Sequence, residues 1–320
     1  MHLMRLSLVF LFGVLAQYAA AQSYPSKPVR VIVPVPPGGI VDVVVRVLGQ
    51  KMTEVMGQSV VIDNRPGAST NIGTEIVARA PGDGYTLLSN SLPLVVNPSL
   101  FPKLPFDVEK DLAPVSMVAS AAYVIVVHPS VPAKSVKELI ALARTKPGIV
   151  KYASAGNGTN LHVAAELFAN LAGVVMVHVP YRGGGPALTA VIGGESDLSF
   201  LALVAVLPQV KAGRLRALAI TSKTRSPVVP ELPTAAESGV PGYEFTSWVG
   251  ILAPATTPAN IVAAINSHIV NAMRAPGVAE RFAGEGANIV ANSPAEFGAQ
   301  IKAELVRWAK VVRENHLKAE

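Results

Sequence analysis

The stretch Val29-Arg-Val-Ile-Val-Pro-Val35, followed by Pro36-Pro-Gly-Gly-Ile-Val-Asp42, decides the fold. Its first part is a run of β-branched residues, which favours a buried strand, and a helical pattern at 41–56 follows the two glycines. The alternation continues with a strand predicted at 59–62, a helix at 71–80 and a strand at 85–88. Continuous apolar strands that alternate with helices predict a parallel sheet covered on both faces.

A second set of elements extends the pattern. Strands are predicted at 115–119, 123–127, 151–153, 174–179, 198–201 and 215–221, and helices at 135–145, 161–172 and 186–192. A strand at 248–253 precedes three helical segments, and capping boxes are predicted at Ser135 with Glu138 and at Ser293 with Glu296. Two such sets, with a last segment that begins at another strand, predict two lobes. A small ligand would bind in the cleft between them.

The first 21 residues have the three parts of a secretory signal. Arg5 precedes an apolar run at 6–16, and small residues at 19–21 precede Gln22. The run is too short to span a bilayer by itself, although an uncleaved anchor helix is the alternative. We expect cleavage near Ala21 and export to the periplasm in soluble form, with no membrane-embedded part left.

The composition narrows the classes of function. The chain of 320 residues has no cysteine, which excludes a disulfide framework, thiolate catalysis and thiolate metal sites. Its formal net charge is +6, or +5 without Arg5, and the basic residues are dispersed. This pattern favours a small anionic ligand over nucleic acid, although ordinary solvated charge accounts for it equally well.

Loops between a strand and a helix contain the first candidate binding residues. Gly38 and Gly39 leave backbone N–H groups unshielded before a helix N-terminus, which suits an anion. Asp42 belongs to the same loop, and in the alternative interpretation it only caps the helix. Arg65, near Ala68 in the next loop, faces an anion or forms a surface ion pair. Ser91 follows the third predicted strand.

The second predicted lobe repeats this design. Ser154, Gly158 and Thr159 present hydroxyls and bare amides at a helix start, and Tyr181 and Gly183 follow the next strand. The first of these loops lacks the spacing of a dinucleotide fingerprint and the lysine of a phosphate-binding loop. His162 lies one turn into the helix, where packing is the more ordinary role. The repetition of such loops in both predicted lobes indicates a binding site, because each loop alone is also explained as an ordinary turn.

The sequence offers no catalytic set. The six histidines have no metal-ligand spacing, and there is no G-x-S-x-G nucleophile elbow. Acidic residues such as Asp42, Asp63 and Asp197 are scattered and form no evident acid–base pair. We therefore expect a binding protein with no cofactor and no metal. An exported enzyme acting on a carboxylate is a minor alternative.

At these residues the chain resembles the substrate-binding receptors of tripartite tricarboxylate transporters, the Bug family. The matching stretches include Tyr24-Pro-Ser-Lys-Pro28, Pro37-Gly-Gly39 with Asp42, Asn64-Arg-Pro-Gly-Ala68, Asn71-Ile-Gly73, Asp83-Gly-Tyr-Thr86, Asn97-Pro-Ser-Leu100, Tyr152-Ala-Ser154, Gly156-Asn-Gly158 with His162, Val179-Pro-Tyr181, Leu232-Pro-Thr234 and Gly239-Val-Pro-Gly242. They cover essentially the whole mature chain in order.

The resemblance implies a two-lobed α/β clamp like the type II periplasmic binding proteins, each lobe a mixed sheet flanked by helices, with crossover strands. Lobe 1 is expected at 22–122 plus 248–320 and lobe 2 at 123–247. The resemblance also implies capture of a small carboxylate in the interlobe cleft and delivery to the permease subunits of a tripartite transporter. We expect a monomer. The alternative function is a periplasmic sensing protein that signals to a receptor kinase.

Residue roles follow from the same resemblance. In the family, the loops matching Gly38-Gly39 and Ala68 hold the ligand's carboxylate, and those matching 154–159 and 181–185 close from the second lobe. This chain departs from the family pattern at Ile40, where Gly or Pro is usual, at Val41, where Thr or Ser is usual, and at Leu201, where a polar residue is usual. These changes predict a more apolar ligand, such as an aromatic or aliphatic monocarboxylate. In the alternative, they pack in the core and leave selectivity unchanged.

Overall fold

The computed structural model describes residues 24–145, 147–284 and 287–318. The predicted signal and its cleavage site near Ala21 lie outside these residues. The described strands, in chain order, are β1 (Val29–Val33), β2 (Val60–Asn64), β3 (Thr86–Asn90), β4 (Leu112–Val127), β5 (Lys151–Ser154), β6 (Val177–Pro180), β7 (Leu198–Ala202), β8 (Arg216–Ile220), β9 (Thr246–Pro254) and β10 (Ala287–Ile289). They form one sheet with the order β2-β1-β3-β9-β4-β7-β5-β6, and β8 and β10 also pair with β4.

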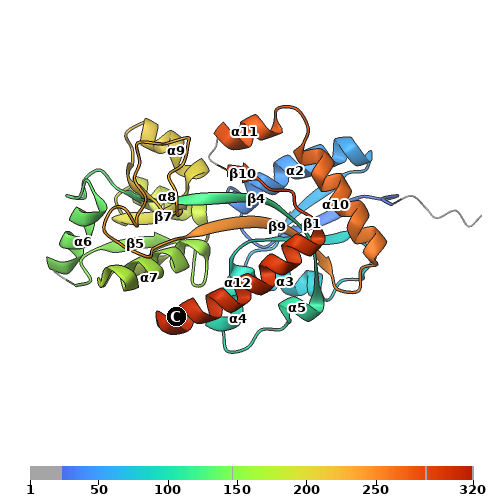
Figure 1. Cartoon of the computed structure of the whole chain (residues 1–320), viewed down its shortest axis with the longest axis horizontal. Coiled ribbons are helices and arrows are strands. Elements are labelled where there is room, and N and C mark those ends of the chain that lie inside the picture. Colours follow the sequence, from blue (N-terminus) through green and yellow to red (C-terminus); the bar gives the residue numbers. More distant parts are fainter. Residues whose placement is uncertain (1–23, 146, 285–286, 319–320) are drawn as a thin grey trace, which may run out of the picture.

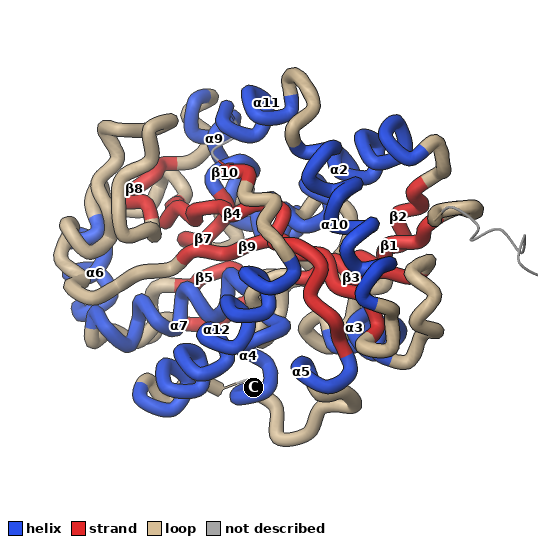
Figure 2. The backbone as a smooth tube through the Cα atoms, turned by 45° about the vertical axis from the view of Figure 1, so that its right-hand side comes forward, coloured by secondary structure: helices blue, strands red, loops and turns tan. Residues whose placement is uncertain are grey.

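Helices lie around this sheet, as Figures 1 and 2 show. They are α2 (Ile40–Met56), α3 (Asn71–Ala78), α4 (Pro93–Leu100), α5 (Val108–Asp111), α6 (Val136–Thr145), α7 (Asn160–Ala172), α8 (Gly184–Ile192), α9 (Leu203–Lys211), α10 (Ala259–Met273), α11 (Val278–Gly284) and α12 (Pro294–Glu314). No helix among the described residues is both long and apolar enough to cross a bilayer.

The strands β4 and β9 connect the two ends of the molecule (Figure 1). They pair antiparallel from Leu112 opposite Pro254 to Ala122 opposite Thr246. On one side β9 continues to β3, which leads to the parallel strands β1 and β2. On the other side the last residues of β4 pair with β7 and β8, and β7 leads to the parallel strands β5 and β6. The sheet is therefore mixed, and it is parallel only toward its two ends.

Two buried clusters lie on this frame. One packs α2 and α10 against β1 and the adjoining strands, with Val44, Leu48 and Ile269 at its centre. Helix α2 supplies apolar residues at helical spacing to this cluster and ends at Gly57, whose left-handed conformation lets its N–H bond the carbonyl of Thr53. The other cluster spans β4, β7, α7 and α12.

The predicted fold class is confirmed, and so are the strand and helix alternation of residues 29–90 and the three final helices. The strands predicted at 115–119 and 123–127 are one continuous strand, β4. Helices α4 and α9 were not predicted. Each has a proline inside it (Pro98, Pro208), a residue that normally breaks helical patterns. The lobe boundaries at 122/123 and 247/248 stay a prediction.

The two predicted capping boxes differ in outcome. At Ser293 both bonds are present, since the hydroxyl accepts from the N–H of Glu296 and the Glu296 carboxylate accepts from the N–H of Ser293. At Ser135 the hydroxyl accepts from the N–H of Glu138, but the Glu138 carboxylate accepts from Lys134, one residue earlier than predicted. Helix ends thus follow the local signals closely but not in every bond.

The packing of α12 on β9 requires a glycine at position 250. A Cβ at Gly250 would overlap the ring of Phe297, which α12 packs on this strand. We expect Gly250→Ala to lower the free energy of unfolding by about 1–3 kcal/mol, because the buried ring has no room to retreat. Chemical denaturation followed by circular dichroism measures this loss.

The matched control is Gly298→Ala, one residue after Phe297 in the same helix. A Cβ there lies 3.5 Å from Cγ of Pro114, an ordinary contact, so we expect no loss and a gain of about 0.5–1 kcal/mol from the better helix former. Equal losses in both variants would contradict the proposed close approach of α12 to β9.

Candidate functional site

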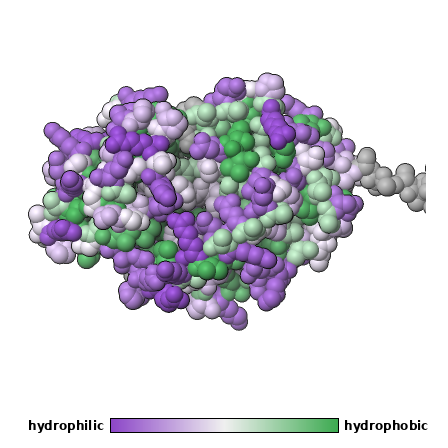
Figure 3. All heavy atoms as spheres, viewed as in Figure 1, coloured by the Kyte–Doolittle hydropathy of each residue, from purple (hydrophilic) through white to green (hydrophobic). Residues whose placement is uncertain are grey.

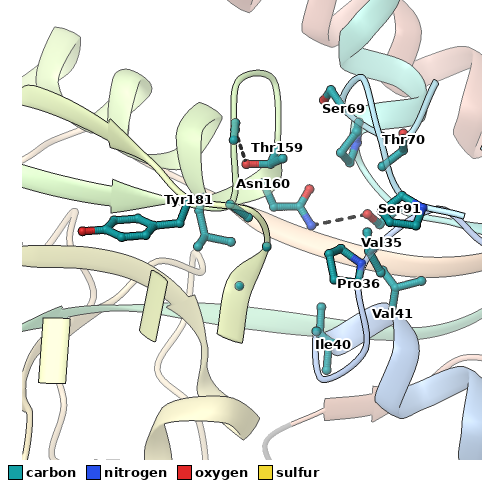
Figure 4. A pocket seen from close by; sticks show the side chains of 18 of the residues that line it. Val35, Pro36, Ile40, Val41, Ser69, Thr70, Ser91, Thr159, Asn160 and Tyr181 are labelled. Carbon is teal, nitrogen blue, oxygen red and sulfur yellow. Dashed lines mark hydrogen bonds between the residues drawn. The ribbon is translucent and has the colours of Figure 1, made fainter. Parts of the chain in front are cut away.

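A cavity of about 640 Å³ opens between loops that follow β1, β2 and β3 on one side and β5, β6 and β7 on the other. Figure 4 shows these loops converging from opposite sides. Figure 3 shows mostly hydrophilic residues, with scattered apolar ones, over the face of Figure 1. The volume is within the range of about 300–1,000 Å³ typical of small-molecule sites.

The loop after β1 is held in shape by Asp42, which is 2% exposed. Its carboxylate accepts from the N–H of Gly38 at 3.0 Å, from Nδ2 of Asn64 at 2.9 Å and from Arg46 at 2.9 Å. Burial alone would raise the pKa of Asp42, but the hydrogen bonds from Arg46, Asn64 and Gly38 lower it below its usual value. Asp42 therefore stays ionised and fixes the Gly38-Gly39 turn at the edge of the cavity. The expectation of an unshielded N–H at Gly38 is wrong, because this carboxylate already accepts from it.

The loop after β2 contains three successive non-glycine residues with positive φ, namely Ala68 (44°), Ser69 (52°) and Thr70 (74°). This rare left-handed turn leads directly into α3, and all three residues line the cavity. Asn97 supports it, since its Nδ2 donates to the carbonyl of Ser69 at 2.7 Å and to Oδ1 of Asn71 at 2.9 Å. Within the described part of the chain, the backbone N–H groups of Ala68, Ser69 and Thr70 have no hydrogen-bond partner.

Glycines bring the loops of the other side against this one. A Cβ at Gly158 would lie 2.8 Å from Oγ of Ser69, and a Cβ at Gly183 would lie 2.9 Å from Cγ of Pro36. Both glycines have positive φ, 71° and 115°. The loops after β5 and β6 thus touch the loops after β2 and β1 across the cavity, and only a residue without a side chain fits at the two contacts.

Asn160 lies at the first turn of α7 and is 7% exposed. Its Nδ2 faces three hydroxyl oxygens, those of Tyr123 in β4 (2.8 Å), Ser247 in β9 (3.0 Å) and Ser91 (3.4 Å). Its Oδ1 is buried and has no partner among the described residues. Figure 4 shows Asn160 beside Thr159, with its amide directed between Thr159 and Ser91.

A buried aromatic cluster stands behind the loop after β5. Ser154 Oγ lies 2.5 Å from Nε2 of His178, whose ring is 4.5 Å from that of His162, and Nδ1 of His162 accepts from the N–H of Gly158. Burial, together with the neighbouring His178 ring, lowers the pKa of His162 to about 3. His162 is therefore neutral at ordinary pH, and its unprotonated Nδ1 accepts the hydrogen bond from Gly158 that holds the loop after β5.

The structure brings most of the predicted binding residues together. Those that line the cavity are Gly38, Gly39, Ala68, Ser91, Thr159, Tyr181, Gly183 and Leu201. Asp42, Ser154, Gly158 and His162 do not line it, but each holds a loop that does. The ring of Tyr181 points away from Asn160, and its hydroxyl lies 3.4 Å from Ser196 (Figure 4). Arg65 forms a surface ion pair with Asp63 at 2.9 Å.

Sequence reasoning missed Asn160, Ser69, Thr70 and Tyr123, all of which line the cavity. A polar residue at the start of a helix beside a candidate loop was a usable signal for Asn160. Tyr123 gave none, because it lies in an apolar strand. The three positive φ angles had no signal either, since Ala, Ser and Thr seldom adopt them.

The cavity is almost free of charge. Among the described residues that line it, Arg182 is the only charged one, and its side chain is exposed. The described residues contain no group of three or more His, Asp or Glu side chains placed to hold a metal ion. The site therefore offers hydrogen-bond donors and apolar surface, with a single cation at its rim.

Comparisons with known proteins agree with this geometry. BugT of Bordetella pertussis is 40% identical over 306 residues, which cover 95% of this chain and 94% of BugT. An R. palustris protein solved with adipate has a TM-score of 0.89 at 34% identity, covering 92% of this chain and 99% of that one. MatC from Rhodopseudomonas palustris, solved with bound malate, has a TM-score of 0.87 at 31% identity, covering 90% and 100%.

The family described as "Tripartite tricarboxylate transporter family receptor" matches residues 44–317. Its members and structural neighbours are periplasmic solute-binding proteins and not enzymes, as expected from the loops. The chain belongs to the tripartite tricarboxylate transporter family of receptors.

Proposed function

We propose that this protein is a periplasmic receptor that captures a small carboxylate in the cavity and delivers it to the permease of a tripartite transporter. Membership of the receptor family and the adipate and malate bound by its structural neighbours support this proposal. The protein acts as a monomer in this scheme, with lobes at 22–122 plus 248–320 and at 123–247.

The observation that carries the proposal is the left-handed turn at Ala68, Ser69 and Thr70. Its backbone N–H groups have no partner in the described chain, and they lie at the cavity wall just before the N-terminus of α3. Unshielded amides at a helix start are suited to a carboxylate. Backbone in this conformation is costly and is concentrated at functional sites, which favours a binding role over a mere turn.

Binding proceeds by closure of the two lobes in this proposal. The carboxylate docks on the unpartnered amides at 68–70, and closure brings Asn160 against it. Each charge-assisted hydrogen bond contributes about 1.5–3 kcal/mol. Because the ligand contacts both sides, it binds the closed state better and shifts the population toward it. The closed state then presents a distinct surface to the permease.

We expect carboxylates to stabilise the protein that begins at Gln22. A ligand at a hundred times its dissociation constant stabilises the fold by about 2.7 kcal/mol, which a thermal-shift assay detects as a rise in Tm. The panel contains adipate, malate, citrate, hexanoate and benzoate. The transport part is tested by uptake of the binding acid in a strain that lacks this gene, where uptake should fall. A protein that binds an acid tightly while uptake stays unchanged would refute the delivery step alone.

The contact between Gly183 and Pro36 gives a second test. A methyl group at position 183 would meet Pro36 at 2.9 Å and hold the two loops apart. We expect Gly183→Ala to weaken binding of the best acid of the panel at least about tenfold, a loss of about 1.4 kcal/mol in isothermal titration calorimetry. The reason is that the variant favours the open cleft.

The matched control is Gly213→Ala. Gly213 also has positive φ, 70°, but a Cβ there meets nothing within 4 Å, and it does not line the cavity. It therefore introduces backbone strain without the contact. We expect a loss of stability and an unchanged dissociation constant. Weakened binding in both variants would assign the effect to general destabilisation.

A further inference from the structure

We infer that the ligand of this cavity is an acid with one ionised carboxylate and an uncharged, mostly apolar body. This inference rests on the proposed function and names the ligand class of the same site. It follows from the separation of polar and apolar surface in the cavity, from the charges around it and from the unpartnered amide of Asn160.

Polar and apolar side chains lie on opposite sides of the cavity (Figure 4). Ser69, Thr70, Thr159 and Asn160 lie toward one side, and Pro36, Ile40 and Val41 lie toward the other, with Ser91 beside Val35 between them. Leu188, Leu201 and Ala205 add further apolar lining. A ligand that fills such a cavity places its carboxylate on the first side and its body on the second.

The charges exclude two competing classes of ligand. No acidic side chain lines the cavity in the described chain, so an ammonium group would be buried without a counter-charge. A second carboxylate beside Ile40, Val41 and Leu201 would meet no polar side chain there. Arg182 is exposed at the rim, where solvent and salt screen it, so it offsets little of this cost.

Asn160 supplies an uncharged anchor for the single carboxylate. The amide nitrogen Nδ2 bonds three hydroxyls, and the amide oxygen Oδ1 is buried without a partner among the described residues. Hydroxyls both donate and accept, so the same contacts form when the amide is turned by half a rotation and Oδ1 faces them. In that orientation Nδ2 takes the unpartnered place, which is closed to water in this conformation, and it donates to the ligand's carboxylate after the amide shifts toward the cavity that Asn160 lines.

Three acids with the same carbon chain test the inference. Hexanoate, adipate and 6-aminohexanoate differ only at the far end, which is a methyl group, a carboxylate or an ammonium. We expect hexanoate to bind at least about tenfold more tightly than either of the others in calorimetry at physiological salt. Tighter binding of adipate, malate or citrate would overturn the ligand class and leave the carboxylate receptor standing. Binding of no acid would overturn both.

Two isosteric variants, at Val41 and at Val43, test whether the apolar side of the cavity contacts the end of the ligand that is far from its carboxylate. Val41→Thr adds a hydroxyl on the apolar side, and we expect the preference for hexanoate over adipate to shrink at least about threefold. Val43→Thr is its control, because Val43 lies two residues further along α2 and does not line the cavity. An unchanged ratio in Val41→Thr would place the ligand's body elsewhere and overturn the assignment.

Asn160→Asp tests the polar side. It keeps the shape and still accepts from the three hydroxyls, but it meets the ligand with a negative charge, so we expect hexanoate binding to fall at least about tenfold. The control is Asn170→Asp, the same change at an exposed position of the same helix outside the cavity lining, which leaves the dissociation constant unchanged. Melting of both variants without ligand checks that they fold. Unaltered binding by Asn160→Asp would overturn the proposed anchor.

Discussion

The antiparallel pair of β4 and β9 is the constraint on which the structure depends. Nearly every other strand is placed by pairing with one of these two or with a strand that does, so the loops on both sides of the cavity inherit their positions from this pair. The pair also touches the site itself, since Tyr123 and Ser247 hold the amide of Asn160 from β4 and β9. A movement of one side against the other therefore has to bend or twist these two strands near the floor of the cavity.

The left-handed turn at 68–70 places energetically unfavourable backbone conformations at the site, and contacts around the turn offset part of their cost. Left-handed backbone costs about 1–3 kcal/mol for a residue other than glycine. Asn97 offsets part of this cost by bonding the carbonyl of Ser69 and the side chain of Asn71, and Asn90 donates to Thr74 at 2.9 Å behind the turn. These buried amides lie outside the cavity lining, and they hold the free N–H groups at its wall without occupying them.

Local patterns predicted much of this architecture, and contacts between distant residues account for the rest. The run at 29–35 predicted β1, and glycines before helices pointed to the loops that converge on the cavity. The role of Asn160 was hidden, because its partners Tyr123 and Ser247 are 37 and 87 residues away in the chain. The conformation of the turn at 68–70 was hidden for the same reason, since propensity disfavours it and the distant Asn97 supports it through the carbonyl of Ser69. The mixed sheet arises because β9 returns between β3 and β4 after the whole second set of elements.

Closure and selectivity are coupled in this cavity through its glycines. Gly158 and Gly183 let the loops of one side approach Ser69 and Pro36 so closely that side chains are excluded at both contacts. The Ser69 contact lies next to the polar side of the cavity and the Pro36 contact next to its apolar side, so closure completes both surfaces at once. An acid that satisfies only the donors leaves water against Ile40 and Val41, whereas an acid with an apolar body removes it and gains about 25 cal/mol per Å² of surface buried. In the proposed mechanism the discrimination therefore arises on closure, when the ligand's body displaces water from the apolar side.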